Sequence, residues 1–401
     1  MLIIKRILQT CLLLLALIIV VINAKLYYTP QCKDGLNQDV LNQLNHLEKE
    51  LKDHQAAQNM QNIFPEGFVF SNVLYGLAWA DVLEKADKQS DVFKKGCAEI
   101  RWSIEQINSE QGKSTFDADL SLPYGAFYNG WLTYLQGKYL QLKNPADLDT
   151  TIANQFKINC LAIQKAIEKT ELPYLESYNQ AAWPADNILC LASLDLHDKI
   201  YPPQYQTTKH AWLSRIKAHL DPEMGLIPHA YNLAENKGSE RVLGSSQSLM
   251  LCFLPALDSP FAQEQFQKYK THFVDYKLTL PAIREYPNGK KGEEHIDSGP
   301  VIWDVGAVAS IVGIKSMLEN NDSVLYKPIR NCIEAFGFSY IFNHEKQYLF
   351  GQLFVADAFI AWSNAKACSF EEDKAGWWRW RFHLLSFLIV VPFCWWVFRL
   401  R

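Results

Sequence analysis

Two acidic segments have residue types and positions that suit proton-transfer chemistry. The first begins a predicted helix near the middle of the chain, where Pro184 suits the first helical turn and Asp186 and Asn187 follow it. Free backbone N–H groups and the helix dipole stabilise a carboxylate at such a position. If this helix start faces a cavity, Asp186 is a candidate general acid or base. The alternative is that both side chains only stabilise the end of the helix.

The second acidic segment, residues 284–300, also precedes a predicted helix. Arg284 and Glu285 are followed by a polar loop that contains His295 and Asp297. In a cavity, an arginine beside acids binds hydroxyl groups, and the acids exchange protons with a ligand. A capped turn without a chemical role is the alternative.

Further candidates are single polar residues and aromatic side chains. His229 lies in a loop, and Glu176 precedes the central helix. Asp304 is the single acid in an apolar run, so we expect it to be buried beside Arg241 or Arg284. Tyrosine and tryptophan are typical of a core, but in a cavity they stack on sugar faces or terpenoid carbon. The aromatic candidates are Tyr75, Tyr128, Trp131 and Trp183.

The elements that position these residues are predicted to be helices. Helices poor in charge and rich in small and aromatic residues alternate with amphipathic helices, and short links join them. This alternation predicts an all-α fold, the (α/α)6 toroid of six helical hairpins, with the buried helices as its inner ring. The loops before the inner helices then open at one end of the ring. We predict helices at about 36–60, 69–87, 92–109, 125–142, 148–169, 185–200, 204–219, 244–256, 261–274, 299–318, 323–336 and 353–364.

Both ends of the chain are predicted to cross a membrane. Residues 7–24 are apolar and uncharged and follow Lys5 and Arg6, which favours an uncleaved anchor over a cleaved signal peptide. The apolar segment 382–398 has tryptophans and arginines at its borders, which favours a second span over an interfacial helix. The expected domains are an anchor at 1–25, a toroid at 33–370 and a second span at 380–399. Two spans place the toroid in the periplasm, outside a bacterial inner membrane.

Net charge and cysteine spacing indicate which binding partners and cofactors to expect. The 401 residues carry a net charge of −4 without a basic run in the central region, so we expect no nucleic-acid partner. A small molecule or glycan and the lipid bilayer are expected, and a homo-oligomer is left open. The nine cysteines include no C-x-x-C pair, which argues against a metal, and no organic cofactor is indicated. Cys32 and Cys368 lie just inside the two anchors, and core burial or a disulfide between them are both open.

Several stretches resemble the linalool dehydratase/isomerase family, which consists of periplasmic α/α toroids. The similar stretches follow the same order and cover roughly residues 65–320. They are YGLA at Tyr75, YNGWLTYL at Tyr128, WPADNILC at Trp183, AWLSRIKAHLDPEMGLIPHAY, DSPFAQEQFQKYKTHFVDY, and the Arg284-Glu285 pair of IREY. The resemblance implies the toroid fold and a role for Tyr75. The family's histidine and two cysteines correspond here to Trp131, Trp183 and Ala192, so its reaction is not implied.

Three functions agree with this pattern. The first is an acid/base enzyme, such as a lyase, isomerase or hydrolase, in which Asp186, Glu285 and Asp297 transfer protons. The second is a toroid that binds or hydrolyses glycans, which also requires paired carboxylates. The third is a scaffold without catalysis, which is favoured if tryptophans fill the cavity.

Overall fold

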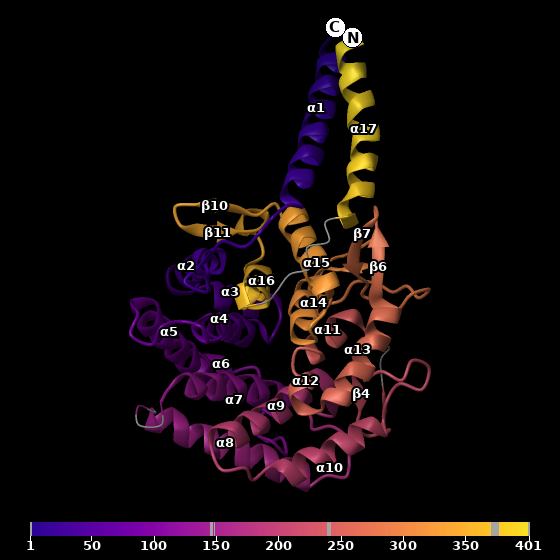
Figure 1. Cartoon of the computed structure of the whole chain (residues 1–401). Coiled ribbons are helices and arrows are strands. Elements are labelled where there is room, and N and C mark those ends of the chain that lie inside the picture. The colour runs from indigo at the N-terminus through magenta and orange to yellow at the C-terminus, as the bar shows by residue number, and fades with distance from the viewer. Residues whose placement is uncertain (1, 145–146, 148, 239–241, 370–376, 400–401) are drawn as a thin grey trace.

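The computed structural model describes residues 2–144, 147, 149–238, 242–369 and 377–399, and most of them lie in α-helices (Figure 1). Six helical segments that are mostly buried follow one another around a closed ring. Each packs against the next in chain order, and the last, α16, packs back on the first, α4. The prediction of an all-α toroid is therefore confirmed. The inner segments are α4 (Gly67–Leu83), α7 (Gly125–Leu142), α9 (Pro184–Ile200), α11 (Gly244–Met250) with the short α12 (Leu254–Leu257), α14 (Ala307–Glu319) and α16 (Phe354–Asn364).

The outer helices are amphipathic and cover the ring. Their apolar side chains point inward, as Val40, Leu44, Leu47 and Leu51 do on α2, where they recur every three or four residues. The predicted helix at 36–60 is divided in two, because Gln55 has a left-handed backbone conformation between α2 and α3. The outer helices are α2 (Gln38–Asp53), α3 (Ala56–Ile63), α5 (Asp91–Asn108), α8 (Thr150–Glu168), α10 (Gln206–Lys217), α13 (Ser259–Phe273) and α15 (Ser323–Phe336), with the short α6 (Glu110–Lys113) after α5.

Aromatic rings from several inner segments meet inside the ring. Trp131 of α7 is fully buried, and its ring centroid lies 5.4 Å from that of Phe70, 6.3 Å from Phe253 and 6.1 Å from Trp362. These residues come from α4, α7, the α11–α12 junction and α16. Edge-to-face contacts at such distances stabilise the packing beyond the buried area alone.

A buried ion network links the C-terminal halves of three inner helices, α4, α7 and α14. The carboxylate of Asp81 lies 3.2 Å from Lys138, 2.7 Å from Lys315 and 3.7 Å from Lys366. Burial alone would raise the pKa of Asp81, but the three ammonium groups outweigh it and hold that pKa well below its usual value. Charges taken out of water in this way require partners, so we interpret the network as structural.

Short antiparallel strands occur in the loops. The prediction of a helix over 299–318 is wrong for its first eight residues, because 301–306 form a hairpin and α14 begins at Ala307. Asp304 therefore lies in a hairpin turn rather than in a buried helix. The strands are β1 (Cys32–Lys33) with β2 (Leu36–Asn37), β3 (Ala181–Ala182) with β4 (Tyr231–Asn232) and β5 (Lys237–Gly238), β6 (Val274–Lys277) with β7 (Leu280–Ile283), β8 (Val301–Ile302) with β9 (Val305–Gly306), and β10 (Tyr340–Phe342) with β11 (Glu345–Gln347).

The first and last helices pack side by side and project from the ring (Figure 1). Both α1 (Leu2–Lys25) and α17 (Trp380–Arg399) are long and apolar enough to cross a membrane. Ile22 and Leu26 pack with Leu280 and Phe382 where the pair meets the ring. A disulfide joins Cys32 to Cys368, with the two Cα atoms 5.8 Å apart, and so links the segments next to both helices.

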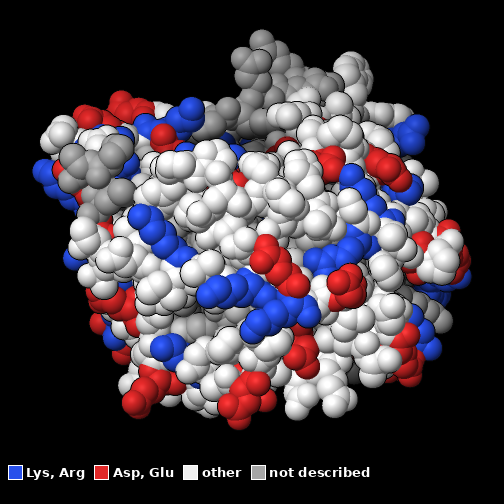
Figure 2. All heavy atoms as spheres, turned by 90° about the horizontal axis from the view of Figure 1, so that it is seen from below, with Lys and Arg blue, Asp and Glu red and all other residues white. Residues whose placement is uncertain are grey.

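The face opposite this helix pair has a different character. Lysines and arginines alternate there with aspartates and glutamates (Figure 2). Interspersed charges of both signs are typical of a surface in contact with water. The apolar helices and the charged face thus lie at opposite ends of the molecule.

Candidate functional site

Loops that precede the inner helices contact one another at one end of the ring. The backbone N–H of Ala126, at the start of α7, donates to the carbonyl of Glu176 in the loop before α9 (2.8 Å). The N–H of Gly244, at the start of α11, donates to the carbonyl of Glu285 in the loop before α14 (2.8 Å). We call this end the mouth. Its polar side chains are Glu66, Ser177, Tyr178, Asp186, His229, Ser245, Ser246, Glu285, His295 and Asp297.

Asp186 is a buried carboxyl at the mouth. Its Oδ2 accepts a hydrogen bond from the hydroxyl of Ser177 (2.6 Å), and that hydroxyl accepts one from the N–H of Trp183 (3.2 Å). Burial raises the pKa of Asp186 to about 8, the carboxylates of Asp297 and Glu66 add to this rise, and the Ser177 hydrogen bond opposes it. Asp186 therefore holds a proton near neutral pH.

Asp297 is the second candidate carboxyl, and its environment is different. Its side chain is 47% exposed, and Oδ2 lies 3.5 Å from Nε2 of His229 and 4.0 Å from Nδ1 of His295. Partial burial would raise the pKa of Asp297, but the two imidazoles outweigh it and lower that pKa. The mouth thus combines a protonated carboxyl with an ionised one.

Each histidine at the mouth also contacts an oxygen through its other ring nitrogen. Nδ1 of His229 is hydrogen-bonded to the hydroxyl of Ser246. Nε2 of His295 lies 3.5 Å from Oε1 of Glu285, and that oxygen accepts a hydrogen bond from Ser245 (2.6 Å). The fully buried Glu285 is therefore placed to orient His295 rather than to meet a ligand directly.

Arg284 and Asp304 form a separate ion cluster. Nη1 of Arg284 lies 2.9 Å from Asp275 and 3.3 Å from Asp304, and Lys277 contacts both acids. Glu285 is the next residue, but its side chain has a different neighbour, because Oε1 accepts a hydrogen bond from Ser245. The expected pair of Asp304 with Arg284 is present, whereas Arg241 lies outside the described residues.

Asn187 and Glu176, two further candidates, form hydrogen bonds with the backbone of the loop before α9. Asn187 is fully buried and pairs with the backbone of Leu175, through bonds of 2.7 and 3.1 Å. Glu176 accepts the N–H of Gln180 (2.9 Å). These contacts fix the loop before α9, so both residues shape the mouth through their own loop.

The four aromatic candidates differ in how far their rings are exposed at the mouth. Tyr75 donates to Glu99 of an outer helix (2.9 Å), and Tyr128 donates to the carbonyl of Ile107 (3.1 Å). Trp131 is fully buried in the aromatic packing of the ring. Trp183 is only half-buried and packs edge-on against Tyr178, with centroids 5.2 Å apart. Of these four, Trp183 is the one that offers a ring surface at the mouth.

Glu66 is a residue of the mouth that was missed in the sequence. Glu66 accepts a hydrogen bond from the hydroxyl of Tyr178, although the residues are 112 positions apart. Burial raises the pKa of Tyr178, and Glu66 and Asp186 add to that rise. Glu66 directly precedes the inner helix α4, and Asp186 lies in the first turn of the inner helix α9, so a search for acids at the starts of inner helices would have found it.

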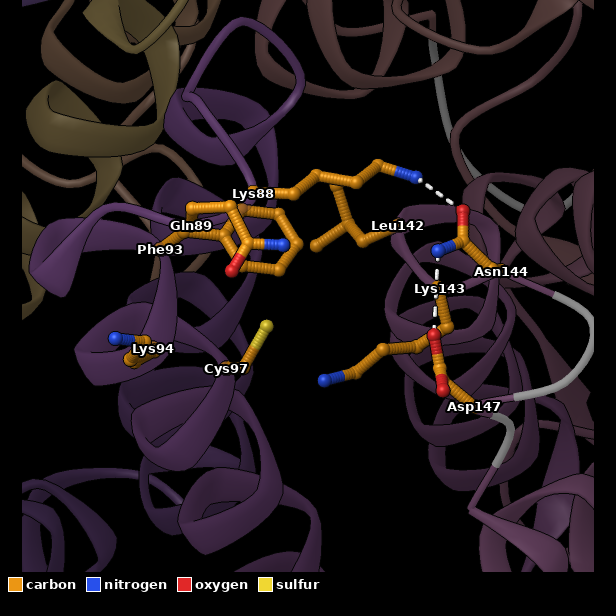
Figure 3. A pocket seen from close by; sticks show the side chains of 9 residues that line it. All are labelled: Lys88, Gln89, Phe93, Lys94, Cys97, Leu142, Lys143, Asn144 and Asp147. Atoms are coloured by element: carbon orange, nitrogen blue, oxygen red, sulfur yellow. Dashed lines mark hydrogen bonds between the residues drawn. The ribbon is translucent and has the colours of Figure 1, made fainter.

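A separate hollow of about 350 Å³ lies on the outside of the ring, between α5 and the link from α7 to α8 (Figure 3). Lys88 crosses its rim and donates to Asn144 (3.0 Å), and the side chain of Cys97 points toward the space (Figure 3). Its lining holds none of the mouth residues. The lining residues are Lys88, Gln89, Phe93, Lys94, Cys97, Leu142, Lys143, Asn144 and Asp147.

Comparisons with known proteins give little beyond this geometry. No protein-family model matches the chain, and no curated protein matches it in sequence. A crystal structure of D-mannose isomerase is similar with a TM-score of 0.46 and 10% sequence identity, over 74% of this chain and 87% of that one. Membership of the linalool dehydratase/isomerase family therefore stays a prediction from the quoted stretches.

Proposed function

We propose that the mouth binds a small hydroxylated molecule and transfers protons to and from it. The observation that supports this most directly is the placement of two carboxyls, Asp186 and Asp297, near enough to interact electrostatically but in contrasting surroundings, with two imidazoles beside Asp297. Groups whose environments separate their proton affinities are the usual acid and base of an enzyme. An isomerase, lyase or hydrolase that acts by proton transfer is the corresponding class.

Each residue then has a distinct role. Asp186 donates a proton to a ligand oxygen, because it is protonated near neutral pH. His229 or His295 accepts a proton; the hydrogen bond to Ser246 orients the ring of His229, and Glu285 lies 3.5 Å from the ring of His295. Trp183, half-buried at the same opening, supplies an apolar face for a sugar ring or a terpenoid chain.

The place of action follows from the two apolar helices. We propose that they span a bacterial inner membrane and hold the ring in the periplasm, where the disulfide between Cys32 and Cys368 is stable.

A ligand screen tests the function. The full chain in detergent is heated with monosaccharides, polyols and terpenoid alcohols, because a ligand that binds the folded state raises the melting temperature. We expect a hydroxylated compound to raise it, and the Asp186→Asn variant to lose the turnover of that compound. A ligand whose binding and turnover are the same in Asp186→Asn would refute the assignment.

A scaffold without catalysis is the second candidate, and the aromatic packing favours it. The ring of Trp131 lies where an open toroid would have its cavity, and rings from three neighbouring segments surround it. A ligand would then be limited to the mouth. Failure of every compound in the screen to raise the melting temperature would favour this candidate.

A further inference from the structure

We infer that His229, His295 and Asp297 form a binding site for one divalent transition-metal ion, of which Zn²⁺ is the representative. One ligand atom from each residue lies within 4.8 Å of the other two. The inference concerns the mouth but does not rest on the proposed function, because ion binding is measured without a substrate. With an ion bound, the imidazoles would be its ligands, and a water molecule on the ion would take over the proton-accepting role that the proposed function gives to a histidine. It also revises the expectation from the cysteine pattern, since the donors are imidazoles and a carboxylate.

The separations suit a small ion. In a tetrahedral zinc site with bonds of about 2.0–2.1 Å, the ligand atoms are roughly 3.3 Å apart. Nε2 of His229 lies 3.5 Å from Oδ2 of Asp297, and Nδ1 of His295 lies 4.0 Å from the same oxygen. The ligand atoms have to move closer together to bind one ion. His295 and Asp297 lie on the same surface loop, so a shift of that loop can bring them closer.

The second nitrogen of each ring faces an oxygen, as in metal-binding histidines. Such a histidine gives its other ring nitrogen to an oxygen, which fixes the tautomer and directs the free lone pair at the ion. Ser246 fills this position for His229. For His295 the buried Glu285 is the corresponding oxygen donor, and its Oε1 lies 3.5 Å from Nε2, so the two have to come closer to form a hydrogen bond. The arrangement of Glu285, His295 and the ion would be a carboxylate–histidine–metal triad.

The charge of the mouth also favours a cation. Among the described residues, the ion-pair partners of Asp297 and Glu285 are these imidazoles rather than a lysine or arginine. Two imidazoles and one carboxylate suit zinc, iron or cobalt, whereas Mg²⁺ and Ca²⁺ prefer oxygen ligands alone. Three protein ligands leave a coordination position open for water or a hydroxyl group of a ligand.

Zinc titration tests the site. The full chain is purified in detergent with its affinity tag removed, stripped with EDTA and titrated calorimetrically with Zn²⁺, and Co²⁺ is added in parallel to record its visible absorption. We expect one ion per chain, a tetrahedral Co²⁺ spectrum, and no comparable heat with Mg²⁺. His295→Gln and Asp297→Asn, both on the surface loop, should weaken binding at least about tenfold, and Ser246→Ala by roughly 10–100-fold.

Two controls separate this site from other zinc ligands and from the acid/base role. Glu294→Gln changes an exposed acid of the same loop and should leave the affinity unchanged. Asp186→Asn should keep zinc binding even where it removes turnover. Binding that is absent in the parent protein, or equally strong in His295→Gln and Asp297→Asn, would overturn the inference, and neither result would bear on the ligand screen.

Discussion

Asp186 and Asp297 are the same residue type at one opening, but their surroundings give them opposite proton affinities. Asp186 is enclosed by the loop before α9 and bonded to a neutral hydroxyl, whereas Asp297 faces two imidazoles on a loop open to water. Because Asp186 has no cationic partner in these contacts, its removal leaves no unpaired charge. Because folding raises its pKa, its contribution to stability should depend on pH.

The Asp186→Asn variant tests that dependence. The pKa of an aspartate is about 3.9 in an unfolded chain, and it is raised to about 8 in the folded protein by burial, with Asp297 and Glu66 adding to the rise. Between these values the folded state holds a proton that the unfolded state has lost, so stability falls as pH rises through this window. The variant should lack this decline and should gain more than about 1 kcal/mol on the parent between pH 4 and pH 8.

Unfolding in detergent at several pH values measures the effect. Asp53→Asn, an exposed change at the end of α2, is the control. Parallel pH profiles for the parent protein and Asp186→Asn would show that Asp186 is ionised when folded.

The residues at the linalool-type positions give another prediction. The predicted resemblance to the linalool dehydratase/isomerase family would place Trp131, Trp183 and Ala192 at the positions of its histidine and two cysteines. The nearby Cys190 is fully buried. Burial also raises the pKa of the Cys190 thiol well above its usual value, so it is a poor nucleophile. We expect no dehydration of linalool and no isomerisation of geraniol, measured by gas chromatography. Any activity found in the screen should survive thiol alkylation, and turnover of linalool would contradict the prediction.

Single residues could be predicted from the sequence only where a position rule applied. Asp186, in the first turn of α9, and Asp297, in the loop that leads to α14, lie at the mouth because the fold brings the starts of the inner helices and their loops together. The direction of a side chain on an irregular loop was not predictable. Arg284 and Glu285 show this, because the first pairs with Asp275 and Asp304 whereas its neighbour accepts a hydrogen bond from Ser245. The pairing of Glu66 with Tyr178 depends on tertiary contact across 112 positions.

At the scale of the elements, the start of α7 supports the loop that carries Ser177. Gly125 has a positive φ of 77°, and a Cβ atom built there would lie 2.2 Å from the carbonyl oxygen of Ser177. Gly125→Ala should therefore displace Ser177 and remove its hydrogen bond to Asp186. We expect it to destabilise the protein by about 1–3 kcal/mol more than backbone strain alone, and to weaken any ligand bound at the mouth.

Gly289→Ala is the matched control for this change. Gly289 has a positive φ of 79°, and nothing lies within 4 Å of a Cβ atom built there. It therefore reports the cost of the left-handed backbone without the clash. Equal losses of thermal stability in the two variants would contradict the prediction, because they would show that the loop before α9 moves away from the new Cβ atom at little cost.

The helices themselves were predictable because their apolar periodicity is strong. The predicted helix at 125–142 matches α7 in both bounds, and that at 323–336 matches α15. The run 299–306 was misread because its apolar residues do not distinguish a helix from a short hairpin. Its turn places Trp303 and Asp304 at positive φ, which composition does not reveal.

For the whole molecule, the orientation in the membrane is the main prediction. Lys5 and Arg6 precede the apolar part of α1, and Arg399 follows that of α17, so both ends should lie in the cytoplasm. A reporter that is active only in the cytoplasm should function at either end of the chain. An export-dependent reporter that is active after α17 would contradict this and would indicate that α17 lies along the membrane surface.

The disulfide between Cys32 and Cys368 makes nearly the whole ring a covalent loop, since 336 positions separate its two ends. A protease that cuts the backbone once anywhere inside this loop opens it but releases nothing. The two pieces remain one molecule, attached at both helices, and they separate on a denaturing gel only after reduction. Shedding the ring from its two apolar helices thus requires a cut on each side of it.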